Sequence, residues 1–167
     1  MEQKNHALLI SVYQHLTRVN KNVHLLLVGE GPLRGQIETA VANAGTANVR
    51  LVGSRQDVAR LLSAMDVFLL TSHYEGLGLA GVEAQAAAVP CVFGPGVPEE
   101  ADVVPELVRR VSSRGDAVEW SQAAMEAMVN RRTVNRSASL ARVANSDFNI
   151  VSSADRTCHI YQQASRN

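Results

Sequence analysis

The segment His73–Val89, HYEGLGLAGVEAQAAAV, decides the fold of this chain. The apolar run Asp66–Leu70 precedes it and the apolar run Pro90–Phe93 follows it, and each run has the length of a buried strand. The segment itself begins with a loop that contains two glycines and continues as an alanine-rich stretch with high helix propensity. The pattern predicts a strand, a glycine loop, a helix that begins near Leu79, and a second strand. The first N–H groups of such a helix point at the crevice beyond the strand ends, where parallel sheets bind ligands and where anions are favoured.

The remainder of the chain repeats the alternation of strand and helix. Apolar runs and helical periods predict strands over 23–28, 48–52 and 103–111, and helices over 5–20, 32–44, 58–65 and 116–130. Pro32 is expected in the first turn of its helix, and the tail over 151–163 is expected to be a closing helix anchored by Phe148, Ile150 and Tyr161. Strands that alternate with helices are typical of a doubly wound parallel α/β sheet, here in one domain.

Composition narrows the class of protein. A chain of 167 residues with a formal net charge of zero and 4% aromatic residues lacks the basic, aromatic surface of a nucleic-acid-binding protein. Cys91 and Cys158 are far apart and lack the spacing of metal ligands, and Cys91 is expected to be a small core residue. The sequence has no secretory signal and no apolar stretch of about 20 residues, so the expected location is the cytoplasm.

Two carboxylates frame the glycine loop. Glu75 precedes the glycines, and Glu83 follows eight residues later within the predicted helix. A carboxylate on the loop accepts hydrogen bonds from sugar hydroxyls, a carboxylate on the helix holds a ribose diol, and the amides between them bind a diphosphate. The arrangement therefore predicts a nucleotide-sugar site. The alternative is that Glu75 is a solvated loop residue and Glu83 a surface residue of an amphipathic helix.

The string from Asp66 to Val92 resembles the donor-site signature of GT-B glycosyltransferases of family 4, in which seven residues separate two glutamates, and is most similar to the bacterial exopolysaccharide and capsule enzymes. The resemblance implies a Rossmann-like fold that forms one half of a GT-B enzyme. Residues 1–167 would be the C-terminal, nucleotide-sugar-binding domain, and the N-terminal acceptor domain would be absent. Ala88 departs from the pattern, because the family commonly has glycine there.

The resemblance also implies roles for individual residues. Glu75 would contact the donor sugar as the candidate catalytic residue, and Glu83 would hold the ribose. The diphosphate would be bound by Lys4 and by the amides of Gly76, Leu77, Gly78 and Leu79; the arginine that accompanies this lysine in the family would precede Met1. Gly29 and Gly31 would form the conformation-setting turn beside the donor, Arg34 would reach a phosphate or lie on its helix surface, and Arg55 would contact the nucleobase. His73 is expected to be a structural or solvent-facing residue rather than a general base.

The resulting expectation is a donor-binding domain of a retaining hexosyltransferase in bacterial polysaccharide biosynthesis, with a UDP-sugar as the favoured donor. Neither a cofactor nor a metal is expected. The separate N-terminal domain is the expected partner, the isolated chain is expected to be inactive, and the full enzyme is expected at the periphery of the inner membrane. The alternative is a non-catalytic module that pairs with a separate N-terminal half. A dinucleotide-binding reductase fits poorly, because Gly35 falls one residue too late for the motif that begins at Gly29.

Overall fold

The protein is described here from a computed structural model that places residues 2–45, 48–112, 115–129 and 134–164. Its elements follow in the order η1 (Glu2–Lys4), α1 (His6–Val19), β1 (Leu25–Val28), α2 (Arg34–Asn43), β2 (Val49–Gly53), α3 (Val58–Ser63), β3 (Phe68–Leu70), α4 (Leu79–Ala86), β4 (Cys91–Phe93), η2 (Glu99–Ala101), η3 (Pro105–Leu107), β5 (Val108–Arg110), α5 (Ala117–Val129), α6 (Arg136–Ala144) and α7 (Ile150–Ala164). The predicted alternation of strands and helices is confirmed. Asn130, the predicted last residue of the helix over 116–130, lies outside the described residues.

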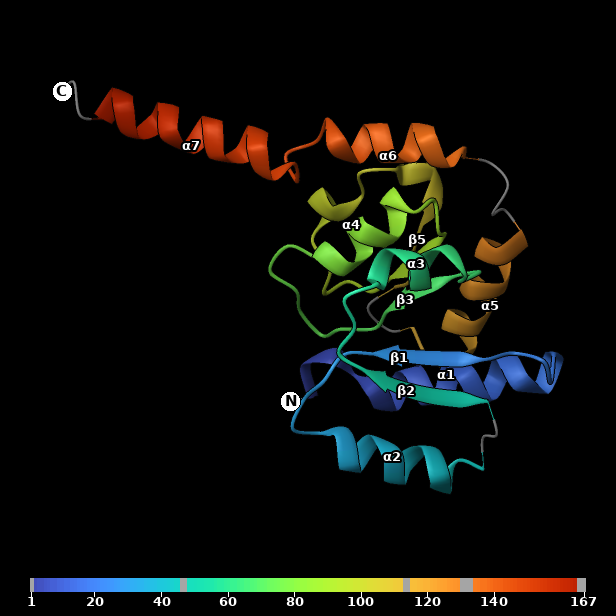
Figure 1. The fold of residues 1–167 in the computed structure, drawn as a ribbon. Helices are drawn as coiled ribbons and strands as arrows, with labels where there is room; N and C mark the ends of the chain where they lie inside the picture. Colours follow the sequence, from blue (N-terminus) through green and yellow to red (C-terminus); the bar gives the residue numbers. More distant parts are fainter. Residues whose placement is uncertain (1, 46–47, 113–114, 130–133, 165–167) are drawn as a thin grey trace.

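All strand pairs among the described residues are parallel. They form two ladders, β1–β2 and β3–β4–β5, and helices cover both faces, as Figure 1 shows. Strand β3 ends at Leu70, and the residues after it bond to the N-terminal segment: the hydroxyl of Thr71 donates to the carbonyl of Lys4 (2.9 Å). The prediction of a Rossmann-like, doubly wound parallel α/β fold is confirmed.

The two core clusters lie on opposite faces of the β3–β4–β5 ladder. Leu70, Cys91 and Phe93 pack with α3 and α4 on one face. Val92 packs with α1 and with Trp120 of α5 on the other face. Successive residues of a strand point to opposite faces, so both sides of this ladder are buried, as a doubly wound sheet requires. Burial strongly raises the pKa of the Cys91 thiol, which agrees with its predicted role as a small core residue.

Several predicted boundaries were wrong by a few residues. Helix α2 begins at Arg34, so Pro32 precedes it rather than occupying its first turn. The strand predicted over 103–111 is confined to Val108–Arg110, because Pro105 starts a single 3₁₀ turn immediately before it. The bounds of helix α1 agree best with the prediction. Asn5 caps its N-terminus by accepting a hydrogen bond from the amide of Leu8 (3.4 Å).

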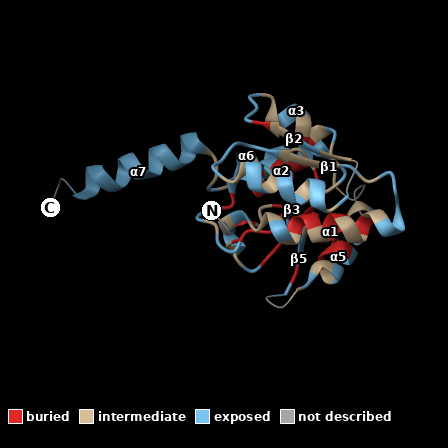
Figure 2. Cartoon of the chain, turned by 90° about the horizontal axis from the view of Figure 1, so that it is seen from below, coloured by how far each residue is buried: buried red, intermediate tan, exposed pale blue. Residues whose placement is uncertain are grey.

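The C-terminal part differs most from the prediction. Helix α6 was not predicted, because its sequence is polar and only Ser139 is buried, where its hydroxyl donates to the carbonyl of Gln85 in α4. Helix α7 exists, but it extends away from the rest of the chain (Figures 1 and 2). Ile150 and Tyr161 were predicted to anchor it, and this is wrong, since they are 78% and 72% exposed. Of the three predicted anchors, only Phe148 packs against a core cluster. No helix in the described ranges is long and apolar enough to cross a membrane.

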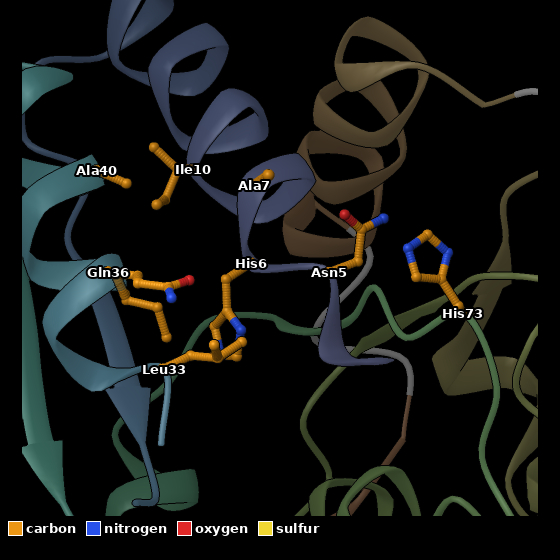
Figure 3. Close-up of a pocket in the computed structure, with 9 residues that line it drawn as sticks. Asn5, His6, Ala7, Ile10, Leu33, Gln36, Ala40 and His73 are labelled. Carbon is orange, nitrogen blue, oxygen red and sulfur yellow. The ribbon is translucent and has the colours of Figure 1, made fainter. Parts of the chain in front are cut away.

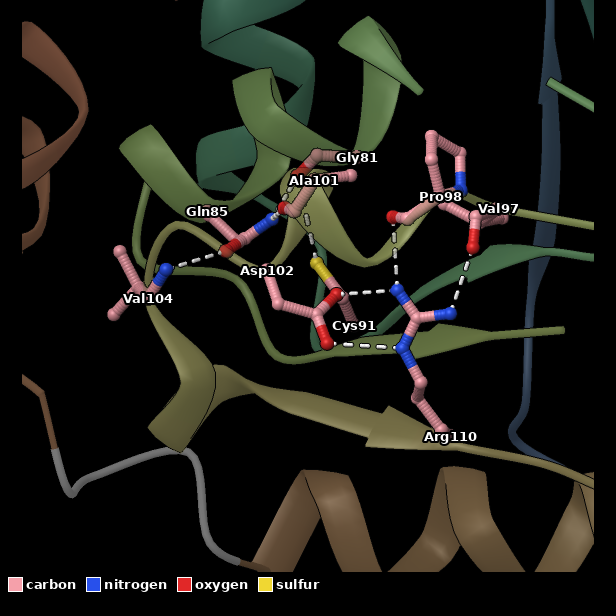
Figure 4. A network of polar contacts seen from close by, with 9 residues as sticks. All are labelled: Gly81, Gln85, Cys91, Val97, Pro98, Ala101, Asp102, Val104 and Arg110. Carbon is pink, nitrogen blue, oxygen red and sulfur yellow. Dashed lines mark hydrogen bonds and ion pairs between the residues drawn. The ribbon is translucent and has the colours of Figure 1, made fainter. Parts of the chain in front are cut away.

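Gln85 is fully buried and joins α4 to the segment that follows β4 (Figure 4). Its side-chain amide donates to the carbonyl of Ala101 (2.7 Å), and its side-chain oxygen accepts from the amide of Val104 (2.7 Å). We expect Gln85→Leu to lower the free energy of unfolding by about 2 kcal/mol, because it leaves two buried backbone groups unpaired. Urea unfolding measures this change. Gln122→Leu on the exposed surface of α5 is the control. An equal loss in both variants would contradict a stabilising role for the hydrogen bonds of Gln85.

Ala88 adopts a left-handed backbone conformation, with a φ of 57°, between α4 and β4. This conformation is costly for a residue with a Cβ atom and free of that cost for glycine, which agrees with the glycine expected here from the resembled donor-site signature. We therefore expect Ala88→Gly to raise the free energy of unfolding by up to about 1 kcal/mol. Thermal unfolding measures the effect, and a destabilised Ala88→Gly variant would show that the side chain matters more than the backbone.

Candidate functional site

The glycine loop lies at the carboxyl end of β3 and leads directly into α4. Gly78 precedes the helix with a φ of 66°, and Leu79 is the first helical residue, as predicted. A β carbon at Gly78 would lie 3.1 Å from the Val97 side chain and 3.2 Å from that of Ala101. Gly78 is therefore required both by the backbone conformation and by close packing. The first N–H groups of a helix lack intrahelical partners, so this helix start can bind an anion.

A hollow of about 410 Å³ opens beside this helix start. Most of its wall is the glycine loop and the first turn of α4, and the remainder comes from β3 and the N-terminal segment. The lining residues are Lys4, Leu70, Glu75, Gly76, Leu77, Gly78, Leu79 and Ala80. The structure thus brings together six of the predicted site residues: Lys4, Glu75 and the run from Gly76 to Leu79.

Lys4 and Glu75 are in contact although they are 71 residues apart in the sequence. The Lys4 ammonium lies 2.7 Å from Oε1 of Glu75, and the Ser72 hydroxyl donates to the same oxygen (2.6 Å). The Glu75 side chain is only 11% exposed, whereas that of Lys4 is 51% exposed. An ammonium has three donors, so Lys4 can hold Glu75 and a second anion at the same time.

The N-terminal segment is fixed to the loop by backbone contacts. The amide of His73 donates to the carbonyl of Gln3 (2.8 Å), and the Gln3 side-chain amide donates to the carbonyl of Tyr74 (3.0 Å). Sequence reasoning missed the contributions of Gln3, Thr71 and Ser72. Only the position of the two polar residues directly after the apolar run of β3 could have signalled Thr71 and Ser72.

Glu83 lies in α4, four residues after Leu79, and is exposed. Residues four apart occupy the same helix face, so Glu83 continues the side of α4 on which Leu79 borders the hollow. It does not itself line the hollow. Glu83 thus lies about one helical turn from the helix start.

The other predicted residues lie outside this hollow. Gly29, with a φ of 129°, and Gly31 form an open turn after β1. Arg34 forms ion pairs with Glu30 and Glu38 (2.8 Å each). Arg55 binds the carboxylate of Asp57 with two hydrogen bonds (2.8 and 2.9 Å), and this guanidinium lowers the pKa of Asp57.

A second hollow, of about 340 Å³, lies between the N-terminal end of α1 and helix α2 (Figure 3). His73 borders it beside Asn5, on the same loop that carries Glu75. His6 also lines it, and burial, followed by the charges of the N-terminus and Lys4, lowers the pKa of its imidazole. Across the described part of the chain, no group of three or more His, Cys, Asp or Glu side chains is arranged to hold a metal ion.

Comparison with known proteins places the chain in a family. Residues 1–143 match the model of the glycosyl transferases group 1, and the chain belongs to this family. Over 122 residues it is 34% identical to the putative glycosyltransferase EpsF of Bacillus subtilis. The aligned region covers 72% of this chain and 32% of EpsF. The chain is 38% identical over 71 residues to the Vi polysaccharide biosynthesis protein VipC/TviE of Salmonella typhi, covering 42% of this chain and 12% of that protein.

The fold is also similar to solved structures. HepE of Anabaena, crystallised in complex with UDP-glucose, superposes with a TM-score of 0.79 at 19% identity, over 98% of this chain and 46% of HepE. The chain therefore spans about a third of the length of EpsF and less than half of HepE.

Proposed function

We propose that the chain is the donor-binding domain of a retaining GT-B glycosyltransferase of family 4, which binds a nucleoside-diphosphate sugar for bacterial polysaccharide biosynthesis. The observation that carries the proposal is the contact between Lys4 and Glu75 at the hollow where α4 begins. A cation, a helix start and a carboxylate meet there, which matches a ligand with a diphosphate and a hydroxyl-rich sugar. The complex of HepE with UDP-glucose and the polysaccharide role named for VipC/TviE agree with this ligand and pathway.

The proposed roles combine the geometry of the hollow with the resemblance to the donor-site signature. The diphosphate lies against the amides of Gly76 to Leu79 and the Lys4 ammonium, while Glu75 accepts hydrogen bonds from the sugar. When the glycosidic bond to the diphosphate breaks, negative charge grows on the leaving group, and the cation and amides stabilise that charge. Glu83 holds the ribose. Arg34 and Arg55 stay candidates for phosphate and base, and each would have to exchange a carboxylate partner in order to reach a donor.

Transfer to an acceptor requires a second surface, which we assign to an N-terminal GT-B domain. We accordingly propose that this chain alone binds donor weakly and transfers little sugar, that no metal participates, and that the complete hexosyltransferase works in the cytoplasm at the inner membrane. The second candidate function is a non-catalytic module that pairs with a separate N-terminal half. The exposed apolar residues of α7, among them Ile150, Val151 and Ile160, favour this candidate.

Calorimetric titration of the chain with UDP, GDP and ADP tests the proposal. Saturable binding of one nucleotide is expected. If a folded chain binds none of the three, the donor-site proposal fails and the module is favoured.

Glu83→Ala is expected to weaken nucleotide binding by about 1 kcal/mol or more, roughly fivefold, because it removes a charged acceptor from the ribose hydroxyls. The same titration measures this change. Glu126→Ala removes a similarly exposed carboxylate from α5 and is the matched control. If Glu83→Ala and Glu126→Ala bind nucleotide equally well, the ribose role of Glu83 is wrong.

A further inference from the structure

The segment from Gly94 to Asp102 forms the second wall behind the glycine loop. The carbonyl of Gly96 accepts a hydrogen bond from the amide of Glu75 (2.8 Å). The Val97 side chain is 1% exposed and lies where a β carbon on Gly78 would approach it to 3.1 Å. A β carbon on Gly96 would collide with the carbonyl oxygen of His73. The loop that carries Glu75 and Gly78 is therefore in tight contact with this wall at both ends.

One side chain, Arg110 of β5, binds this wall at several points (Figure 4), and Gln85 of α4 bonds to it at the carbonyl of Ala101. Its guanidinium donates to the carbonyls of Val97 (2.7 Å) and Pro98 (2.9 Å). It also binds the carboxylate of Asp102 through two hydrogen bonds, from Nε (2.9 Å) and Nη2 (2.8 Å). Four contacts thus use the planar fork of donors that distinguishes arginine from lysine.

The same side chain is supported from the sheet. Its guanidinium carbon lies 5.9 Å from the centre of the Phe93 ring, a cation–π distance. Phe93 is completely buried and packs against α4 at Gly81. Arg110 therefore has a fixed position relative to both the wall and the helix whose start borders the hollow, and its side chain is only 28% exposed.

We propose that Arg110, with Asp102, is a positioning residue for the donor site: it fixes the carbonyls of Val97 and Pro98, and the wall they belong to fixes Glu75 and Gly78. Arg110 does not line the hollow. Its effect on a ligand is indirect and passes through two contacts, the Gly96–Glu75 hydrogen bond and the packing of Val97 on Gly78. The functional part of this inference rests on the proposed donor site.

The test compares Arg110→Gln with Arg109→Gln. Arg109 is the neighbouring residue of β5, and its guanidinium lies 3.2 Å from a Glu126 oxygen in an exposed ion pair, so its replacement removes the same charge without loosening the wall. The first measurement is hydrogen exchange of the Glu75 amide without ligand, because this amide bonds to the wall. We expect exchange at least about tenfold faster in Arg110→Gln and unchanged in Arg109→Gln, as for a local opening.

The second measurement is nucleotide affinity by calorimetry. We expect at least about fivefold weaker binding in Arg110→Gln and wild-type binding in Arg109→Gln. Arg110→Lys keeps the positive charge but not the planar set of guanidinium donors, so we expect the same results as for Arg110→Gln. It replaces Arg110→Gln in both measurements if that variant fails to fold.

Unchanged exchange of the Glu75 amide in both Arg110 variants overturns the structural part of the inference. Faster exchange of the Glu75 amide with unchanged nucleotide affinity overturns the proposed effect of Arg110 on the donor site. Absence of nucleotide binding by the wild type refutes the proposed function and this effect with it, while the exchange result still decides the structural part.

Discussion

Lys4→Ala is expected to weaken binding of a nucleoside-diphosphate sugar by about ten- to a hundredfold, the range for loss of a hydrogen bond to a charged group. Two consequences combine in this variant. The diphosphate loses its cation, and Glu75, which is largely buried and 2.7 Å from the ammonium, loses its counter-ion next to the ligand's negative charge. The affinity of wild type and variant for UDP-glucose, measured by calorimetry, checks this prediction.

Lys21→Ala is the matched control, because Lys21 is the other lysine of the chain and follows the far end of α1. A helix of 14 residues is about 21 Å long, so Lys21 lies well away from the hollow. Equal affinities of Lys4→Ala and Lys21→Ala would show that Lys4 only anchors the N-terminal segment.

Gly81→Val is expected to lower the free energy of unfolding by about 3 kcal/mol, the upper end of the usual cost of overpacking a tight core. A β carbon at Gly81 would lie 2.5 Å and 2.7 Å from two carbons of the Phe93 ring. The ring is completely buried, so it cannot move aside into solvent, and α4 must shift away from β4. Urea unfolding measures the loss, provided that the free energy of unfolding falls with urea concentration at the same rate in wild type and variant.

Gly35→Val in α2 is the control for this substitution. Gly35 is also a helical glycine, but no atom beyond its chain neighbours and the backbone of its own helix lies within 4 Å of the position its β carbon would take. We expect its stability to change little or to rise, since valine favours a helix slightly more than glycine does. A similar loss in Gly35→Val would mean that valine in place of a helical glycine is destabilising in itself, and that the contact with Phe93 does not determine the Gly81→Val result.

The sequence predicts the central elements well because their signals are local. The start of α4 at Leu79 follows from two glycines ahead of an alanine-rich run, and the limits of α1 follow from Asn5 and Asn20. Helix α6 could not be recognised in this way, since its burial depends on Ser139 and on a contact with Gln85, which is 54 residues away. Periodicity also predicts an apolar face on α7, but it cannot say whether anything covers that face.

The sequence predicts six of the eight residues that line the hollow, but not the contacts between them. Glu75 and Lys4 were each proposed from motifs, yet no local pattern indicates that their side chains meet. In contrast, the ion pair of Arg34 with Glu38 joins two residues four apart within α2 and could have been predicted. Arg110 carried no signal, because its partners are the carbonyls of Val97 and Pro98 and the distant Asp102, which only the folded chain brings together.

The central claim is that a nucleoside-diphosphate sugar binds at the start of α4. The most direct measurement is a titration of the isotopically labelled chain with UDP-glucose, followed by the amide resonances in NMR spectra. We expect saturable shifts at Gly76, Leu77, Gly78, Leu79 and Ala80, all of which line the hollow. Saturable shifts that are confined to the hollow between α1 and α2, around His6 and Gln36, would contradict the claim, as would spectra that do not change at any concentration of the ligand.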